Sequence, residues 1–149
     1  MDRPADEPFF AFFNEIGIIA QLSRAMFEAR LPDGVSVPHF SVLNHLVRVR
    51  DGRTPLELAR AFQVPKATMT NTLGGLQTRG FIEMRANEKD GRSKQVWLTQ
   101  KGKEFREQSM AMLRESTKPM QASLPVAEIL ELLPKLARVR MVLDQMRDG

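Results

Sequence analysis

The sequence contains no cysteine and no tyrosine, and it has one tryptophan and two histidines. Without cysteine the chain cannot form disulfides, use a thiolate nucleophile, sense oxidants through a thiol or bind zinc through sulfur. His39 and His45 are the only imidazoles, so a histidine-rich metal site is not expected. We therefore predict no metal site and no resident cofactor.

Targeting segments and catalytic motifs are missing as well. Met1 is followed by Asp2-Arg3-Pro4 instead of the basic and apolar segments of a signal peptide, and no stretch is long enough to span a membrane. The sequence has no phosphate-binding loop, no metal-ligand spacing and no nucleophile triad. We expect a cytoplasmic protein without a membrane partner, and not an enzyme.

The composition is that of an ordinary globular domain. Of the 149 residues, 42% are hydrophobic and 27% are charged, which argues against disorder. The net charge of +4 suits a polyanionic partner. A mild excess of this kind is weak evidence by itself, so the positions of the basic residues matter more.

Apolar residues recur at helical spacing in six segments. We predict helices over about 8–31, 37–50, 55–62, 66–79 and 99–117, and a last helix after Pro125. Pro134 lies inside the last pattern and should kink or divide that helix. The predicted inward-facing residues of the middle segments are Phe40, Leu43, Leu46, Val47, Leu58, Ala59, Phe62, Met69, Leu73 and Leu76.

Residues 55–98 follow the order of a winged helix-turn-helix. The tight turn Gln63-Val64-Pro65 joins two short helices, and Thr54 with Glu57 can form a capping box at the start of the first. Residues 81–85 and 95–98 are predicted strands, and the polar segment between them predicts a hairpin with a charged tip, which is the wing. The expected fold class is mainly α (α+β), with a two-stranded wing.

This order of elements resembles the multiple-antibiotic-resistance regulator (MarR) family. Residues 58–80 are similar to its helix-turn-helix, and residues 90–93 and 98–102 are similar to its wing motif and the start of the following helix. The resemblance covers nearly the whole chain. It implies one domain over 1–149, with a winged helix-turn-helix lobe at 36–98 and dimerisation helices at 8–31 and 99–147.

The chain departs from the family pattern at several positions. Gln63 stands where glycine is usual, Pro65 where a capping serine is usual, and Asn71 where arginine is common. Gly74 and Gly75 each weaken the predicted recognition helix by about 1 kcal/mol relative to alanine. These changes concern the target sequence more than DNA binding itself.

The resemblance implies a sequence-specific regulator of transcription that binds double-stranded DNA, a homodimeric repressor on a pseudo-palindromic operator. The recognition helix would enter the major groove, where Asn71 can pair with adenine and Ala67 or Thr68 can meet a thymine methyl. By the resemblance, Arg92 enters the minor groove, while Asp90 would pair with a nearby arginine. The predicted DNA-binding residues are Arg53, Thr54, Lys66, Ala67, Thr68, Thr70, Asn71, Arg85, Lys89, Asp90, Arg92, Ser93 and Lys94.

The terminal helices carry more apolar surface than a compact winged-helix core can cover. Exposed apolar area of this size indicates an interface, and the resemblance implies that these helices interleave between two chains. A twofold dimer would place two recognition helices about one DNA turn apart. The competing interpretation is a monomer with an ordinary helical core.

Two further interpretations stay open. Relatives often bind small aromatic or anionic effectors, for which Phe13, Ile16, His39 and Leu43 could line a space, although ordinary core packing accounts for the same residues. A different class of function is a winged-helix protein-interaction module without specific DNA binding. A steep fall of affinity with salt would favour DNA.

Overall fold

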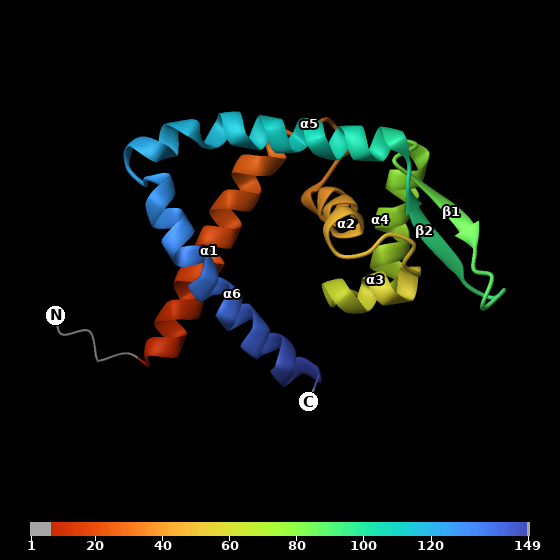
Figure 1. The fold of residues 1–149 in the computed structure, drawn as a ribbon, viewed down its shortest axis with the longest axis horizontal. Coiled ribbons are helices and arrows are strands. Elements are labelled where there is room, and N and C mark those ends of the chain that lie inside the picture. Colours follow the sequence, from red (N-terminus) through yellow and green to blue (C-terminus); the bar gives the residue numbers. More distant parts are fainter. Residues whose placement is uncertain (1–6, 149) are drawn as a thin grey trace. The chain divides into compact units, whose positions relative to one another are not determined.

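The computed structural model describes residues 7–148, and the chain forms two compact units that meet at Met110 and Ala111, within α5. The ribbon in Figure 1 follows the order of these elements along the chain. The first unit contains α1 (Pro8–Glu28), α2 (Val37–Arg48), α3 (Pro55–Phe62), α4 (Lys66–Thr78), β1 (Ile82–Ala86), β2 (Lys94–Leu98) and the beginning of α5 (Gln100–Thr117). The second unit contains the rest of α5, the 3-10 helix η1 (Lys118–Ala122) and α6 (Val126–Asp148).

The predicted fold class is confirmed, and the boundaries differ by one to three residues, the largest difference being the end of the first helix at Glu28 instead of 31. The second helix ends at Arg48 and the fourth at Thr78, and the strands lie at 82–86 and 94–98. Such shifts are common because helix ends fray. Helix α6 continues through Pro134 without a break. The sequence predicted that Pro134 would kink or divide this helix, and the predicted division is wrong.

The start of α3 follows from its sequence. The Glu57 amide donates to Thr54 Oγ1 at 3.2 Å, and the Thr54 amide donates to Glu57 Oε1 at 3.1 Å, with Pro55 in the first turn. This is the capping box that the sequence predicts. A second box, unpredicted, begins α2, where the Ser36 amide donates to His39 Nδ1 at 2.9 Å.

The turn between α3 and α4 contains a strained residue. Gln63 has a φ of 52° and a left-handed conformation, which among the described residues no other non-glycine residue adopts. The Val64 amide donates back to the Ala59 carbonyl at 3.0 Å and closes the turn. A side chain in this conformation meets its own backbone, which is why glycine suits such a position better.

The core of the first unit lies between α2, α3, α4 and the hairpin. Leu43, Leu58, Leu76 and Val96 are completely or almost completely inaccessible. Val47 was predicted to face inward, and this is wrong, because α2 instead buries Val42, Leu43 and Leu46 and leaves Val47 exposed near its end. The remaining buried members of the cluster are Ala59, Met69, Leu73, Phe81, Ile82 and Leu98.

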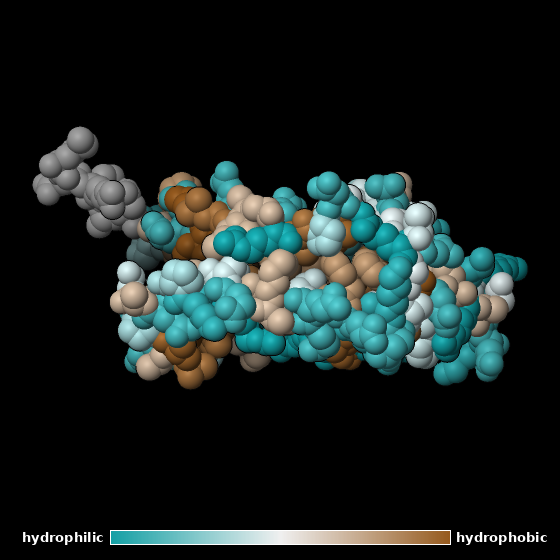
Figure 2. Space-filling view, turned by 90° about the horizontal axis from the view of Figure 1, so that it is seen from above, coloured by the Kyte–Doolittle hydropathy of each residue, from teal (hydrophilic) through white to brown (hydrophobic). Residues whose placement is uncertain are grey.

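Both terminal helices expose apolar side chains, and Figure 2 shows such residues open on the surface as brown patches. On α1, Phe9 and Phe10 are 70% and 68% exposed, and only Phe27 is buried. On α6, Leu130 and Met146 are 61% and 72% exposed, and the described part of that helix buries no residue. In the single chain, many apolar residues of both helices are exposed, whereas a folded monomer normally buries such residues.

Candidate nucleic-acid interface

Helix α4 presents a polar face opposite its buried one. Met69, Leu73 and Leu76 anchor the helix in the core, so the residues half a turn away face solvent. All five residues predicted on this helix are exposed: Lys66, Ala67, Thr68, Thr70 and Asn71. The structure thus brings these predicted site residues together on the N-terminal half of α4.

The exposed row continues beyond the residues that the sequence analysis selected. Ala67, Asn71, Gly74 and Thr78 are spaced by four, three and four residues, and all four are exposed. This is the spacing of one helix face, so extending the pattern from Ala67 and Asn71 would have found the last two. Lys66 is the only charged residue within α4.

The wing is an antiparallel hairpin whose tip is held by its own hydrogen bonds. The strands pair from Ile82 with Leu98 to Ala86 with Lys94. At the tip, the Arg92 amide donates to Asp90 Oδ1 at 3.0 Å, and the Ser93 amide donates to the Asp90 carbonyl at 3.2 Å. These bonds leave the Arg92 side chain exposed at the turn.

Asp90 does not have the partner that we predicted. Its carboxylate accepts the Arg92 backbone amide, and the ion pairs of residues 7–148 include none with Asp90. An aspartate that bonds the amide two residues on is a standard way to fix a turn. The predicted ion pair between Asp90 and an arginine is therefore wrong. Asp90 instead shapes the wing tip by accepting a hydrogen bond from the backbone amide of Arg92.

Two of the predicted DNA-binding residues, Arg53 and Arg85, also make contacts within the lobe and the wing. Arg53 Nη1 lies 2.9 Å from His45 Nε2, and Arg53 Nε lies 3.6 Å from a Glu57 oxygen, with 22% of the Arg53 side chain exposed. Arg85 pairs with Glu83, and its guanidinium carbon lies 5.0 Å from the ring centroid of Trp97. These arginines support the wing and α3, and the Thr54 hydroxyl is used by the cap of α3.

The wing is fastened to the lobe by residues 51–53, between α2 and α3, to which the sequence analysis gave no structural role. Asp51 Oδ1 accepts the Leu98 amide at 3.1 Å and the Gly52 amide at 3.0 Å. Arg53 forms a backbone bridge with Val96. A Cβ at Gly52 would lie 2.5 Å from the Trp97 ring, and its φ is 73°, so glycine is required there.

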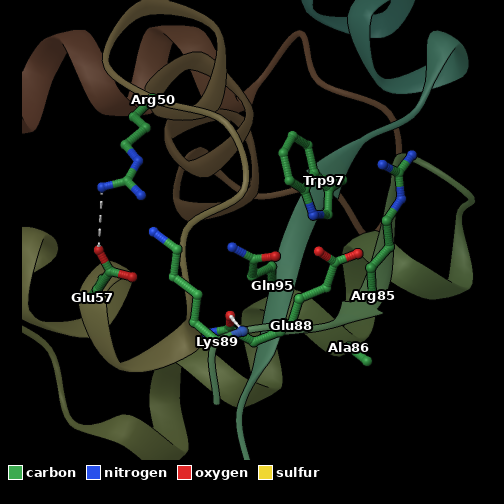
Figure 3. A pocket seen from close by; sticks show the side chains of 9 residues that line it. Arg50, Glu57, Arg85, Ala86, Glu88, Lys89, Gln95 and Trp97 are labelled. Carbon is green, nitrogen blue, oxygen red and sulfur yellow. Dashed lines mark hydrogen bonds and ion pairs between the residues drawn. The ribbon is translucent and has the colours of Figure 1, made fainter. Parts of the chain in front are cut away.

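A hollow of about 410 Å³ lies between the wing and the start of α3, as Figure 3 shows. It is lined by Arg50, Glu57, Arg85, Ala86, Asn87, Glu88, Lys89, Gln95 and Trp97. Lys89 extends into it from the wing tip, and Arg50 Nη1 lies 3.9 Å from Glu57 Oε2. Its lining includes three basic and two acidic residues, and two of the basic ones, Arg50 and Arg85, are paired with glutamates.

Burial and neighbouring arginines keep both histidines neutral near pH 7. Desolvation is the larger cause that lowers the pKa of His45, and Arg53 adds to it. Desolvation and then Arg79 lower the pKa of His39 in the same way. The pKa of Glu57 is lowered chiefly by the hydrogen bond from the Thr54 backbone, so that carboxylate stays charged.

The four predicted effector residues lie in different environments. Leu43 is fully buried in the core, Phe13 is 40% exposed on α1, and Ile16 and His39 are half-buried. None of them lines the hollow beside the wing. Among residues 7–148 no group of three or more acidic or histidine side chains could hold a metal ion, and no helix is long and apolar enough to cross a membrane.

Comparison with known proteins gives consistent matches. Residues 33–93 match the family model described as MarR family. The HTH-type transcriptional repressor YetL of Bacillus subtilis (strain 168) is 40% identical over 76 residues, which are 50% of this chain and 46% of that protein. The chain thus matches about half the length of this relative.

Solved structures share the fold over most of the chain. A MarR transcriptional regulator from Methanosarcina mazei Go1 superposes with a TM-score of 0.77 at 22% identity, covering 96% of this chain and 100% of that one. A mutant MarR from E. coli complexed with operator DNA superposes with a TM-score of 0.72 at 23% identity, covering 89% and 95%. At these identities the likeness shows the fold.

Proposed function

We propose that the protein is a transcription regulator that binds double-stranded DNA, on the premise that residues 33–93, which match the MarR family model, form a winged helix-turn-helix of that family. The observation that carries the proposal is the pairing of two exposed elements on one core. Helix α4 offers an uncharged polar face, and the wing tip beside it offers Arg92. A groove-reading helix and a basic tip are the two parts that such a regulator needs.

The chemistry of α4 favours A·T pairs in the major groove. Asn71 can bond both polar atoms of an adenine edge, and Ala67 or Thr68 can contact a thymine methyl. The helix has no arginine, and its one cation, Lys66, lies at its first residue, where it suits a phosphate. Replacing Asn71 should therefore relax selectivity at one base pair in each half-site.

Lys89, Lys94 and Arg92 supply the electrostatic part of binding. All three are exposed at the wing. Arginine in a narrow minor groove meets an enhanced negative potential, and lysines beside it can follow the phosphates. Arg53 holds the wing in place and acts on DNA through its position, while the exposed side chain of Arg85 can also reach a phosphate.

The working form is a homodimer that acts as a repressor. The exposed apolar side chains of α1 and those of α6 each need a cover, which a second copy provides symmetrically. A stable monomer does not normally expose this many apolar side chains. YetL is a transcriptional repressor, and repression is the corresponding proposal for this chain. Release by a small aromatic or anionic effector remains a prediction.

A selection experiment tests the function. The full chain is incubated with a pool of random-sequence duplexes, the bound fraction is amplified, and affinity is measured by fluorescence anisotropy at 50 and 200 mM salt. We expect an enriched pseudo-palindrome and an affinity that falls steeply with salt. No enriched sequence, or an affinity independent of salt, would leave the interaction module as the better interpretation.

A further inference from the structure

The two adjacent glycines of α4 have different surroundings. A Cβ built on Gly75 would lie 2.6 Å from His39 Nε2, so any side chain there would displace a ring that the capping box of α2 holds in place. A Cβ built on Gly74 would meet nothing within 4 Å, and Gly74 is exposed. Neither residue has a positive φ. Packing within the first unit therefore explains why residue 75 is a glycine. Nothing in the packing or backbone conformation of that unit explains why residue 74 is one.

A glycine in the exposed middle of a helix lowers stability relative to alanine. Gly74 lies in the third turn of α4, in the outward row formed with Ala67, Asn71 and Thr78. Where neither conformation nor packing needs a glycine, the remaining physical use is the close approach of another molecule to the backbone.

The other residues of the row point to the same use. Ala67 and Asn71 have short side chains, and α4 has no arginine that could reach a base edge from a distance. Such side chains touch base edges only if the helix backbone lies deep in the groove. A side chain at the next position of the row would hold the helix away from the duplex.

We propose that Gly74 is a DNA-contact position, at which the α4 backbone packs directly against the duplex and lets Ala67 and Asn71 reach the bases. This inference rests on the proposed function. It makes Gly74 a determinant of affinity and selectivity that acts by the absence of a side chain. The thermal stability of the protein and its affinity for DNA should then respond to substitution in opposite directions.

The test uses full-length Gly74→Ala and the duplex selected by the wild-type protein. We expect the melting temperature to stay the same or to rise by about 3 °C, because alanine favours the helix. The dissociation constant should rise at least tenfold. The dependence of log affinity on log salt should keep its slope, because no charge is removed.

Gly75→Ala is the matched control, with the same added methyl one residue away. It should lower the melting temperature, because the methyl meets His39. A loss of affinity smaller than threefold in Gly74→Ala, or a lower melting temperature in that variant, would overturn the inference. If the wild-type protein selects no duplex, the proposed function fails first and this inference falls with it.

Discussion

Arg92 is the residue on which minor-groove binding depends in this account. Asp90 fixes the backbone of the wing tip, and the Arg92 side chain projects from it into solvent. Arg92→Ala should weaken DNA binding by about 1–3 kcal/mol, or roughly 5–150-fold, without changing the melting temperature, since the side chain is exposed. Anisotropy titration at moderate salt measures the change.

Lys103→Ala is the control for Arg92, because it removes one exposed positive charge on α5, outside the wing. Its effect on affinity should be small. An unchanged affinity in Arg92→Ala would show that the wing tip does not contribute to binding. An equal loss in both variants would show that net charge and not the wing tip determines binding.

His45 and His39 predict a dependence of stability on pH. Both have a pKa below the 6.5 of an unperturbed histidine, so the unfolded chain takes up protons at a higher pH than the folded chain. Their contribution to stability is complete above pH 6.5 and is lost as pH falls from there through the lower folded pKa. Glu57 acts in a separate window below pH 4.5, because its pKa is lowered from that value.

Thermal melts between pH 7.5 and 5.5 measure the histidine contribution. The melting temperature should fall with pH in the wild-type protein. In His45→Gln the fall should be shallower, because glutamine can still accept from Arg53 and does not titrate. If the two profiles run parallel, His45 is not one of the groups responsible.

The sequence could identify exposed polar residues more reliably than the partners of charged ones. The five residues of α4 were found because a helix pattern defines its outward face without further information. The roles of Arg53 and Asp51 depend partly on contacts with residues far along the chain, the backbone bridge from Arg53 to Val96 and the hydrogen bond from the Leu98 amide to Asp51. Periodicity carries no signal of such contacts, so the sequence alone could not predict that these two residues fasten the wing.

At the scale of elements, the turn of the helix-turn-helix gives a direct test of local strain. Gln63 adopts the left-handed conformation that glycine adopts freely. Gln63→Gly should raise the free energy of unfolding by up to about 1 kcal/mol, since relief of strain is partly offset by the greater freedom of glycine in the unfolded chain. Urea denaturation measures it.

Gly80→Ala is the opposite control, because Gly80 has a φ of 76° at the end of α4. That variant should be less stable than the wild-type protein. If Gln63→Gly is destabilised instead, the Gln63 side chain contributes more to the turn than its backbone strain costs.

Elements with local chemical signatures were predicted well. The capping box of α3, the wing hairpin and the start of α5 at Thr99 all depend on residues close together in the chain, and the Gly102 amide does donate to Thr99 Oγ1. The exposure of Val47 could not be predicted in the same way. It depends on which side of α2 the hairpin and α4 cover.

At the scale of the whole molecule, the proposed symmetric dimer would present two α4 helices and two wings to one duplex. The apolar residues of α1 and of α6 supply the reason for the second copy, and the polar face of α4 with Arg92 supplies the reason for DNA. A twofold dimer would match a target with the same symmetry. Each copy should therefore occupy one half of a pseudo-palindromic site.

Hydroxyl-radical footprinting of the full chain on its selected duplex tests this claim most directly. The account predicts two equivalent sets of protected sugars, with centres about 10 base pairs apart, appearing together as protein is added. Protection of a single half-site at saturation, or no protection at concentrations where the duplex is bound, would contradict it.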